Sequence, residues 1–170
     1  MKALVLQEPG DPSGLVLKEL PIPQITANEV LIAVRSLGIN PIDVKTRSGG
    51  GLYGALKSEK PLILGWDASG IVAEAGSGVT QFKKGDEVFG MINFPGHGKA
   101  YAEYVAAPAD QLTIKPSNIS HNEAAAASLA AAHPRRASSA ARTQLTSFKW
   151  GIRTLAPSNP LRLRFEAFEL

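Results

Sequence analysis

The chain has 170 residues, which suits one domain or one domain followed by a tail, and it contains no cysteine, which excludes disulfide bonds, thiolate zinc sites and a cysteine nucleophile. Its net charge of +3 is unevenly distributed, because 1–132 hold 11 Lys and Arg against 13 Asp and Glu, whereas 133–170 hold 7 against 2. The main body therefore gives no reason to expect a nucleic-acid partner. The absence of a signal peptide or a long apolar run predicts a cytoplasmic protein that binds no membrane.

The first third of the chain is predicted to contain short strands joined by glycine and proline turns. Apolar or β-branched runs favour strands at 2–6, 16–20 and 29–38. Asn40 followed by Pro41 is typical of the start of a helix with an asparagine N-cap, which predicts a short helix up to residue 47. The glycine-rich run 48–54 predicts a flexible loop.

The middle of the chain continues this alternation of turns and strands. Turns leading into strands are predicted at 61–76 and 85–90, and a further strand at 102–108. Ser120 and Glu123 have the spacing of a capping box, and the alanine-rich run 124–132 behind them is strongly helical. Many short strands with one late helix predict a mainly β fold with short helices, arranged as a partly open β-barrel or folded sheet.

Three sequence blocks follow one another at 38–49, 61–90 and 100–105. The first contains Asn-Pro-x-Asp-x-Lys-x-Arg. The second contains Leu-Gly-x-Asp-x-Ser-Gly-x-Val, then Gly-x-x-Val-x-x-Phe, then Gly-Asp-x-Val-x-Gly; the third is Ala-Tyr-Ala-Glu-Tyr-Val. Together they resemble the N-terminal GroES-like (alcohol dehydrogenase-like) domain of zinc-independent medium-chain dehydrogenase/reductases of the quinone oxidoreductase (zeta-crystallin-like) type. The resemblance extends over 1–132.

The positions of the zinc ligands in related enzymes argue against a metal site. Zinc-dependent relatives place Cys near position 40 and a His-Glu pair near 66 and 67, where this chain has Asn40, Trp66 and Asp67. One carboxylate without a nearby thiolate or imidazole is a poor zinc site, so we expect no metal. The three histidines, His97, His121 and His133, are scattered and are expected to be surface residues, although the loop around His97 is open to a substrate contact.

The resemblance implies an NAD(P)H-dependent oxidoreductase, with NADPH as cofactor, that reduces a small-molecule quinone or the C=C bond of an enone by hydride transfer. Lys45 is expected to stabilise the charge that develops on the carbonyl oxygen, and Tyr53 to line the substrate mouth or donate a proton. Asn40, Asp43 and Asp67 are expected at the cofactor, with Asp43 orienting Lys45 or a ribose hydroxyl. The residues alone leave alternatives open: Asn40 as a simple N-cap, Lys45 as a solvated residue and Asp67 as a turn residue.

Members of that family continue from the helix near 123–132 into a Rossmann domain that supplies most cofactor contacts. Residues 133–170 contain no strand–glycine–helix unit, and Gly-Ser-Gly at 76–78 lacks the third glycine and the helix of a phosphate cradle. We therefore expect the Rossmann domain to be absent. We also expect 133–170 to be a basic tail that is either disordered or the product of a frameshift or splicing error.

A chain of this kind is expected to be inactive alone and to bind NADPH weakly or not at all. Two alternatives to a truncated reductase are a non-enzymatic GroES-like binding module and a non-functional truncation product. A homodimer is an option for a full-length form. The run 124–132 is expected to expose apolar surface that a second domain would cover.

Overall fold

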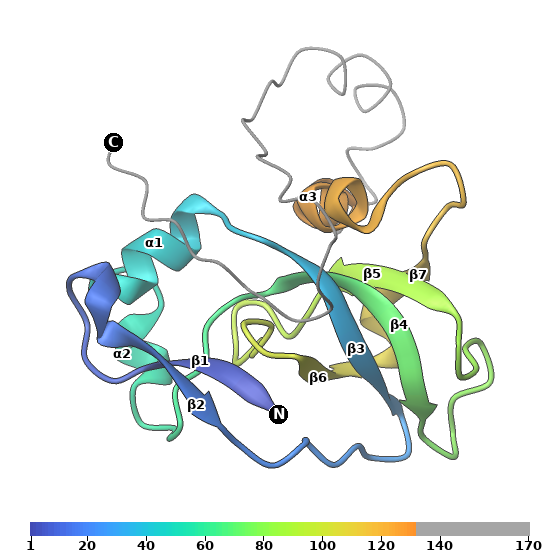
Figure 1. The fold of residues 1–170 in the computed structure, drawn as a ribbon, viewed down its shortest axis with the longest axis horizontal. Coiled ribbons are helices and arrows are strands. Elements are labelled where there is room, and N and C mark those ends of the chain that lie inside the picture. The colour runs from blue at the N-terminus through green and yellow to red at the C-terminus, as the bar shows by residue number, and fades with distance from the viewer. Residues whose placement is uncertain (132–170) are drawn as a thin grey trace.

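The computed structural model describes residues 1–131, which form two antiparallel sheets and a few short helices (Figure 1). The larger sheet contains five strands in the spatial order β6 (Tyr104–Pro108), β3 (Glu29–Gly38), β4 (Asp67–Ala75), β5 (Glu87–Met91) and β7 (Leu112–Ile114). The smaller sheet pairs β1 (Lys2–Leu6) with β2 (Leu15–Glu19). Among these described strands the edges β6 and β7 do not pair with each other, so the larger sheet stays open. The predicted mainly β, partly open architecture is confirmed.

The helices occupy two separate places around the sheets. They are α1 (Pro41–Arg47), α2 (Tyr53–Leu56) and α3 (His121–Ala131), with 3-10 turns at Pro12–Gly14 and Ala109–Gln111. Figure 1 shows α1 and α2 beside the smaller sheet, whereas α3 lies across the larger sheet and contacts β3, β4 and β5. Within residues 1–131, no helix has both the length and the apolar character that crossing a bilayer requires. The predicted tail 133–170 lies outside the described residues.

Two apolar clusters stabilise this arrangement. The first lies within the larger sheet and includes Val30, Ile32, Val72, Val88 and Val105. The second joins the smaller sheet to α2 and to the segment before β4, and includes Leu4, Leu6, Leu56, Leu62 and Trp66. Leu37 of β3 and Met91 of β5 pack against the second cluster, so burial connects the smaller sheet to the larger one, and isolated bridges join β1 to the segments that precede β4 and β6.

The pairing of β3 with β4 depends on one close backbone approach. A Cβ atom added at Gly70 would lie 2.2 Å from the carbonyl oxygen of Ala33 and 2.7 Å from Cγ2 of Ile32. The same ladder is irregular between Val34 and Ser36, where the register shifts. Only a residue without a side chain fits at Gly70, and the shifted register brings Gly38 opposite Asp67.

The local structure departs from the expectations in a few places. The predicted loop 48–54 ends early, because α2 begins at Tyr53 and places Leu56 in the second apolar cluster. The strand β7 was not predicted, since its three residues are too few to show a period. The expected apolar exposure of 124–132 is tested only at its start: Ala124 and Ala125 are buried against the sheet, because small side chains allow the helix to lie close to it, whereas Ala126 is exposed.

Candidate functional site

The start of α1 is organised by a reciprocal contact between its N-cap and its third residue. Asn40 has the extended backbone of an N-cap, and Pro41 occupies the first helical position. The backbone N–H of Asn40 donates to Oδ2 of Asp43 at 2.8 Å. This is the predicted N-cap with an acidic residue reaching back, and it turns the Asp43 carboxylate toward the protein interior, where it is 2% exposed.

A second carboxylate meets the same asparagine from a different strand. Asp67 is the first residue of β4, is 1% exposed, and lies opposite Gly38 on β3 and Met91 on β5. Its Oδ2 accepts a hydrogen bond from Nδ2 of Asn40 at 2.7 Å. Asn40, Asp43 and Asp67, all predicted cofactor residues, therefore form one group, which we call the acidic cluster.

Burial controls the protonation of the acidic cluster. Loss of hydration raises the pKa of Asp43 from 3.8 to about 6, against the opposing effect of the Asn40 N–H. Loss of hydration also raises the pKa of Asp67 to about 6, with the neighbouring charge of Asp43 adding to the rise and the Asn40 amide opposing it. Oδ1 of Asp43 and Oδ1 of Asp67 have no hydrogen-bond partner among the described residues. The two carboxyl groups are thus buried close together with incomplete stabilisation of their charges.

Tyr101 completes the surroundings of the cluster and was not predicted as a site residue. It lies before β6, is 6% exposed, and packs in the second apolar cluster. Burial, and then the charge of Asp43, raise the pKa of its hydroxyl above the ordinary tyrosine value. The hydroxyl therefore stays protonated and remains a neutral neighbour of Asp43. The sequence signal was present, since Tyr101 belongs to the Ala-Tyr-Ala-Glu-Tyr-Val block.

The two predicted catalytic residues lie apart from the acidic cluster. Lys45 is exposed on α1 and forms no ion pair among the described residues, while Asp43 is turned inward. Residues two apart on a helix point in different directions, so Asp43 does not orient Lys45. Tyr53 is half-buried at the start of α2, against the second apolar cluster. The catalytic roles of Lys45 and Tyr53 stay predictions.

At a position that carries a zinc ligand in the zinc-dependent relatives, this chain has a hydrogen-bonded indole. Nε1 of Trp66 donates to the carbonyl oxygen of Gly96 at 2.7 Å, and its ring meets Phe94 edge to face with centroids 5.8 Å apart. An indole N–H is only a donor and offers no lone pair to a metal. Across residues 1–131, no group of three or more His, Asp or Glu side chains is arranged to hold a metal ion.

The described histidines are structural partners rather than unattached surface residues. Nε2 of His97 lies 2.9 Å from Oε2 of Glu59. Nδ1 of His121 lies 2.8 Å from the Ser69 hydroxyl, and its Nε2 lies 3.3 Å from Oε1 of Glu87. Burial lowers the pKa of His121, so its side chain anchors the start of α3 to β4 and β5 chiefly in the neutral form. The expectation of a simple surface residue is therefore wrong for His121.

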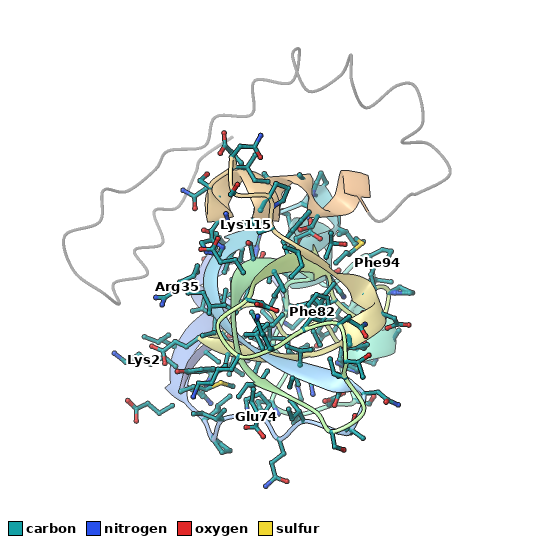
Figure 2. All side chains as sticks on the ribbon, turned by 90° about the vertical axis from the view of Figure 1, so that its right-hand side faces the viewer. Lys2, Arg35, Glu74, Phe82, Phe94 and Lys115 are labelled. Atoms are coloured by element: carbon teal, nitrogen blue, oxygen red, sulfur yellow. The ribbon has the colours of Figure 1, made fainter. Side chains whose placement is uncertain are left out.

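Lys115 and the glycines of 76–78 lie outside the acidic cluster. Lys115 lies directly below α3 in Figure 2, and its Nζ pairs with Oε2 of Glu87 at 3.0 Å and donates to the carbonyl oxygen of Ile119 at 2.7 Å. The glycines of 76–78 are followed by a turn and irregular chain up to β5, which supports the rejection of a phosphate cradle there. His133 lies outside the described residues.

Comparisons with known proteins agree with this fold and motif set. The family model of the alcohol dehydrogenase GroES-like domain matches residues 26–117, more than half of the chain. The NADPH-dependent alkenal/one oxidoreductase, chloroplastic, of Arabidopsis thaliana is 35% identical over 136 residues, covering 76% of this chain and 35% of that protein. The quinone oxidoreductase of Sus scrofa is 36% identical over 129 residues, covering 74% of this chain and 37% of that protein.

Solved structures give the same result. The quinone oxidoreductase from Coxiella burnetii superposes with a TM-score of 0.70 at 42% identity, covering 74% of this chain and 40% of that one. The Escherichia coli quinone oxidoreductase complexed with NADPH gives 0.65 at 33% identity, covering 74% and 36%. The chain belongs to the alcohol dehydrogenase GroES-like domain family, and its relatives confirm the predicted quinone oxidoreductase type. It spans well under half of the length of the relatives that it matches.

Proposed function

We propose that this protein takes part in NADPH-dependent, zinc-independent reduction of quinones or of the C=C bond of enones, and that the acidic cluster lies at the nicotinamide end of the site. The observation that carries the proposal is that Asn40 joins two buried carboxylates from separate sequence blocks of the family. Relatives named as alkenal/one and quinone oxidoreductases support this substrate class.

The residues of the acidic cluster fit one end of the cofactor. Asn40 is the half-exposed member, whereas the other two are buried. One N–H of its amide is committed to Asp67, which leaves Oδ1 as an acceptor for a hydroxyl or a primary amide. Those are the donor groups of a nicotinamide riboside. When bound, the cofactor supplies a hydride, and this chain's own contribution is to hold the reacting end in place.

The other end of the cofactor has no matching site in residues 1–131. Among these residues there is no parallel strand–glycine–helix unit whose backbone N–H groups would hold a pyrophosphate. The described domain therefore presents one wall of a reductase cleft. We expect it to bind the nicotinamide half of NADPH weakly and the adenosine half not at all. Lys45 as carbonyl donor and Tyr53 as substrate contact belong to the same proposal.

The test is to titrate the isotope-labelled 170-residue chain with reduced nicotinamide mononucleotide and, separately, with adenosine 2′,5′-bisphosphate, while recording amide NMR spectra. We expect the first ligand to shift the side-chain amide of Asn40 and the backbone amides near Asp67, and the second to shift neither. Asn40→Ala should abolish the response of the backbone amides near Asp67, whereas Asn118→Ala, which replaces an exposed asparagine, should retain it. No response at Asn40, or an equal response to both ligands, would overturn the proposal.

A further inference from the structure

The acidic cluster places two carboxyl groups where two negative charges are poorly tolerated. Asp43 is 2% and Asp67 is 1% exposed, and each has one oxygen without a partner among the described residues. Within 1–131, no Lys, Arg or His side chain forms an ion pair with either of them. Burying one unpaired charge is costly, and two in one site repel each other in addition.

The groups that face the pair are neutral donors rather than cations. Asn40 supplies one backbone and one side-chain N–H. Tyr101 faces Asp43 with a hydroxyl that keeps its proton. Arg47, on the same helix as Asp43, directs its guanidinium to the carbonyl oxygen of Gly10 instead. Helix α3 brings the carbonyl oxygen of Ala125 beside Gly38, the residue paired with Asp67.

The backbone N–H of Asn40 donates to Oδ2 of Asp43 at 2.8 Å, and its side-chain N–H donates to Oδ2 of Asp67 at 2.7 Å. The unpartnered atom is Oδ1 in both residues. A proton placed on one Oδ1 removes one charge without disturbing either hydrogen bond from Asn40. One carboxylate then remains to accept from the Asn40 N–H groups, whereas two buried charges repel each other and two neutral acids accept more weakly, so the geometry favours one proton over none or two.

We propose that Asp43 and Asp67 together retain one proton at mildly acidic pH and act together as positioning residues that fix the amide of Asn40 with Oδ1 toward a ligand. The proposal deepens the proposed function, because Asn40 is the cluster member that meets the ligand there. With one carboxylate ionised, the charge holds the Asn40 N–H groups inward and leaves its carbonyl outward. Loss of this proton on going to neutral pH adds a second charge and strains the same contacts.

The test uses the whole 170-residue chain without any cofactor, so its outcome does not depend on ligand binding. Aspartate carboxyl carbons and the Asn40 side-chain amide are followed by NMR from pH 3 to 9. We expect the Asp43 and Asp67 signals to titrate together in two steps, the upper one near pH 6, and the Asn40 amide to follow the upper step.

Removing one carboxyl group should lower the pH at which the other loses its proton. Asp43→Asn keeps the shape and can still accept from the Asn40 N–H, so Asp67 should then titrate in a single step about one pH unit lower. Asp67→Asn gives the converse measurement on Asp43 should the first variant fail to fold. Asp110→Asn, which removes an exposed carboxyl group, should change neither midpoint. Independent single steps near the ordinary value of about 4, or an unchanged Asp67 midpoint in Asp43→Asn, would overturn the proposal.

Discussion

Replacing Asp67 by Asn tests how strongly the fold is destabilised by a buried carboxylate. The pKa of Asp67 rises from 3.8 to about 6, mainly because burial removes its hydration. That rise corresponds to about 3 kcal/mol lost from the free energy of unfolding once the group is ionised at pH 7. Between about pH 4 and pH 6 the folded state holds more protons than the unfolded state, so the free energy of unfolding falls as pH rises through this window.

The measurable part of this effect lies between pH 5 and pH 7. Over that range Asp67 alone should change the free energy of unfolding by about 1 kcal/mol, with the protein more stable at pH 5. His121 acts in the opposite direction, because burial lowers its pKa and its stabilising neutral form is lost as pH falls. Comparing the chain with its Asp67→Asn variant cancels that contribution, since His121 is present in both.

Urea unfolding at pH 5, 6 and 7, followed by circular dichroism, gives the required free energies. The unmodified chain should gain about 1 kcal/mol more than Asp67→Asn on going from pH 7 to pH 5. Asp110→Asn serves as the matched control, because it removes an exposed carboxyl group outside the acidic cluster and should keep the full pH response. Identical pH responses of the chain and Asp67→Asn would refute the link between burial and charge.

Three other predictions concern stability. Gly70→Ala should lower the free energy of unfolding by about 2 kcal/mol, because its Cβ would lie 2.2 Å from the Ala33 carbonyl oxygen. Gly54→Ala, whose Cβ would meet no atom within 4 Å, should not destabilise the fold. Equal urea midpoints for the two variants would contradict the close approach at Gly70. Ser120→Ala should cost about 1 kcal/mol, because its Oγ accepts from the Glu123 N–H at 3.2 Å; an unchanged Tm would argue against the cap. EDTA should leave Tm unchanged in this cysteine-free chain, and a drop would reveal a bound metal.

The elements that the sequence predicts well are those specified by neighbouring residues. The strand at 29–38 and the helix over 41–47 are found with the predicted bounds, because a β-branched run and an N-cap followed by proline act locally. The capping box of Ser120 is present as well, with both reciprocal bonds to Glu123. The strands at 16–20 and 102–108 have ends shifted by one or two residues, which periodicity does not specify.

The sequence predicts part of the candidate site, and the contacts that it does not predict join residues far apart in the chain. Asn40, Asp43 and Asp67 come together as family motifs suggest, but the bond from Asn40 to Asp67 spans 27 residues and depends on the irregular β3–β4 register. The approach of Tyr101 to Asp43 has the same origin, because it requires the segment before β6 to pack beside α1. The exposure of Lys45 follows from helix geometry once Asp43 is known to point inward.

Gly38 connects the acidic cluster to α3 and therefore to the rest of the chain. A Cβ atom at Gly38 would lie 2.9 Å from Cβ of Asp67 and 2.9 Å from the carbonyl oxygen of Ala125. The same position thus sets how closely β4 approaches β3 and how closely α3 lies over both. Within the described residues, the packing of α3 is therefore fixed relative to the strands that carry the acidic cluster. The geometry of the acidic cluster and the placement of α3 over the larger sheet thus have a common structural cause.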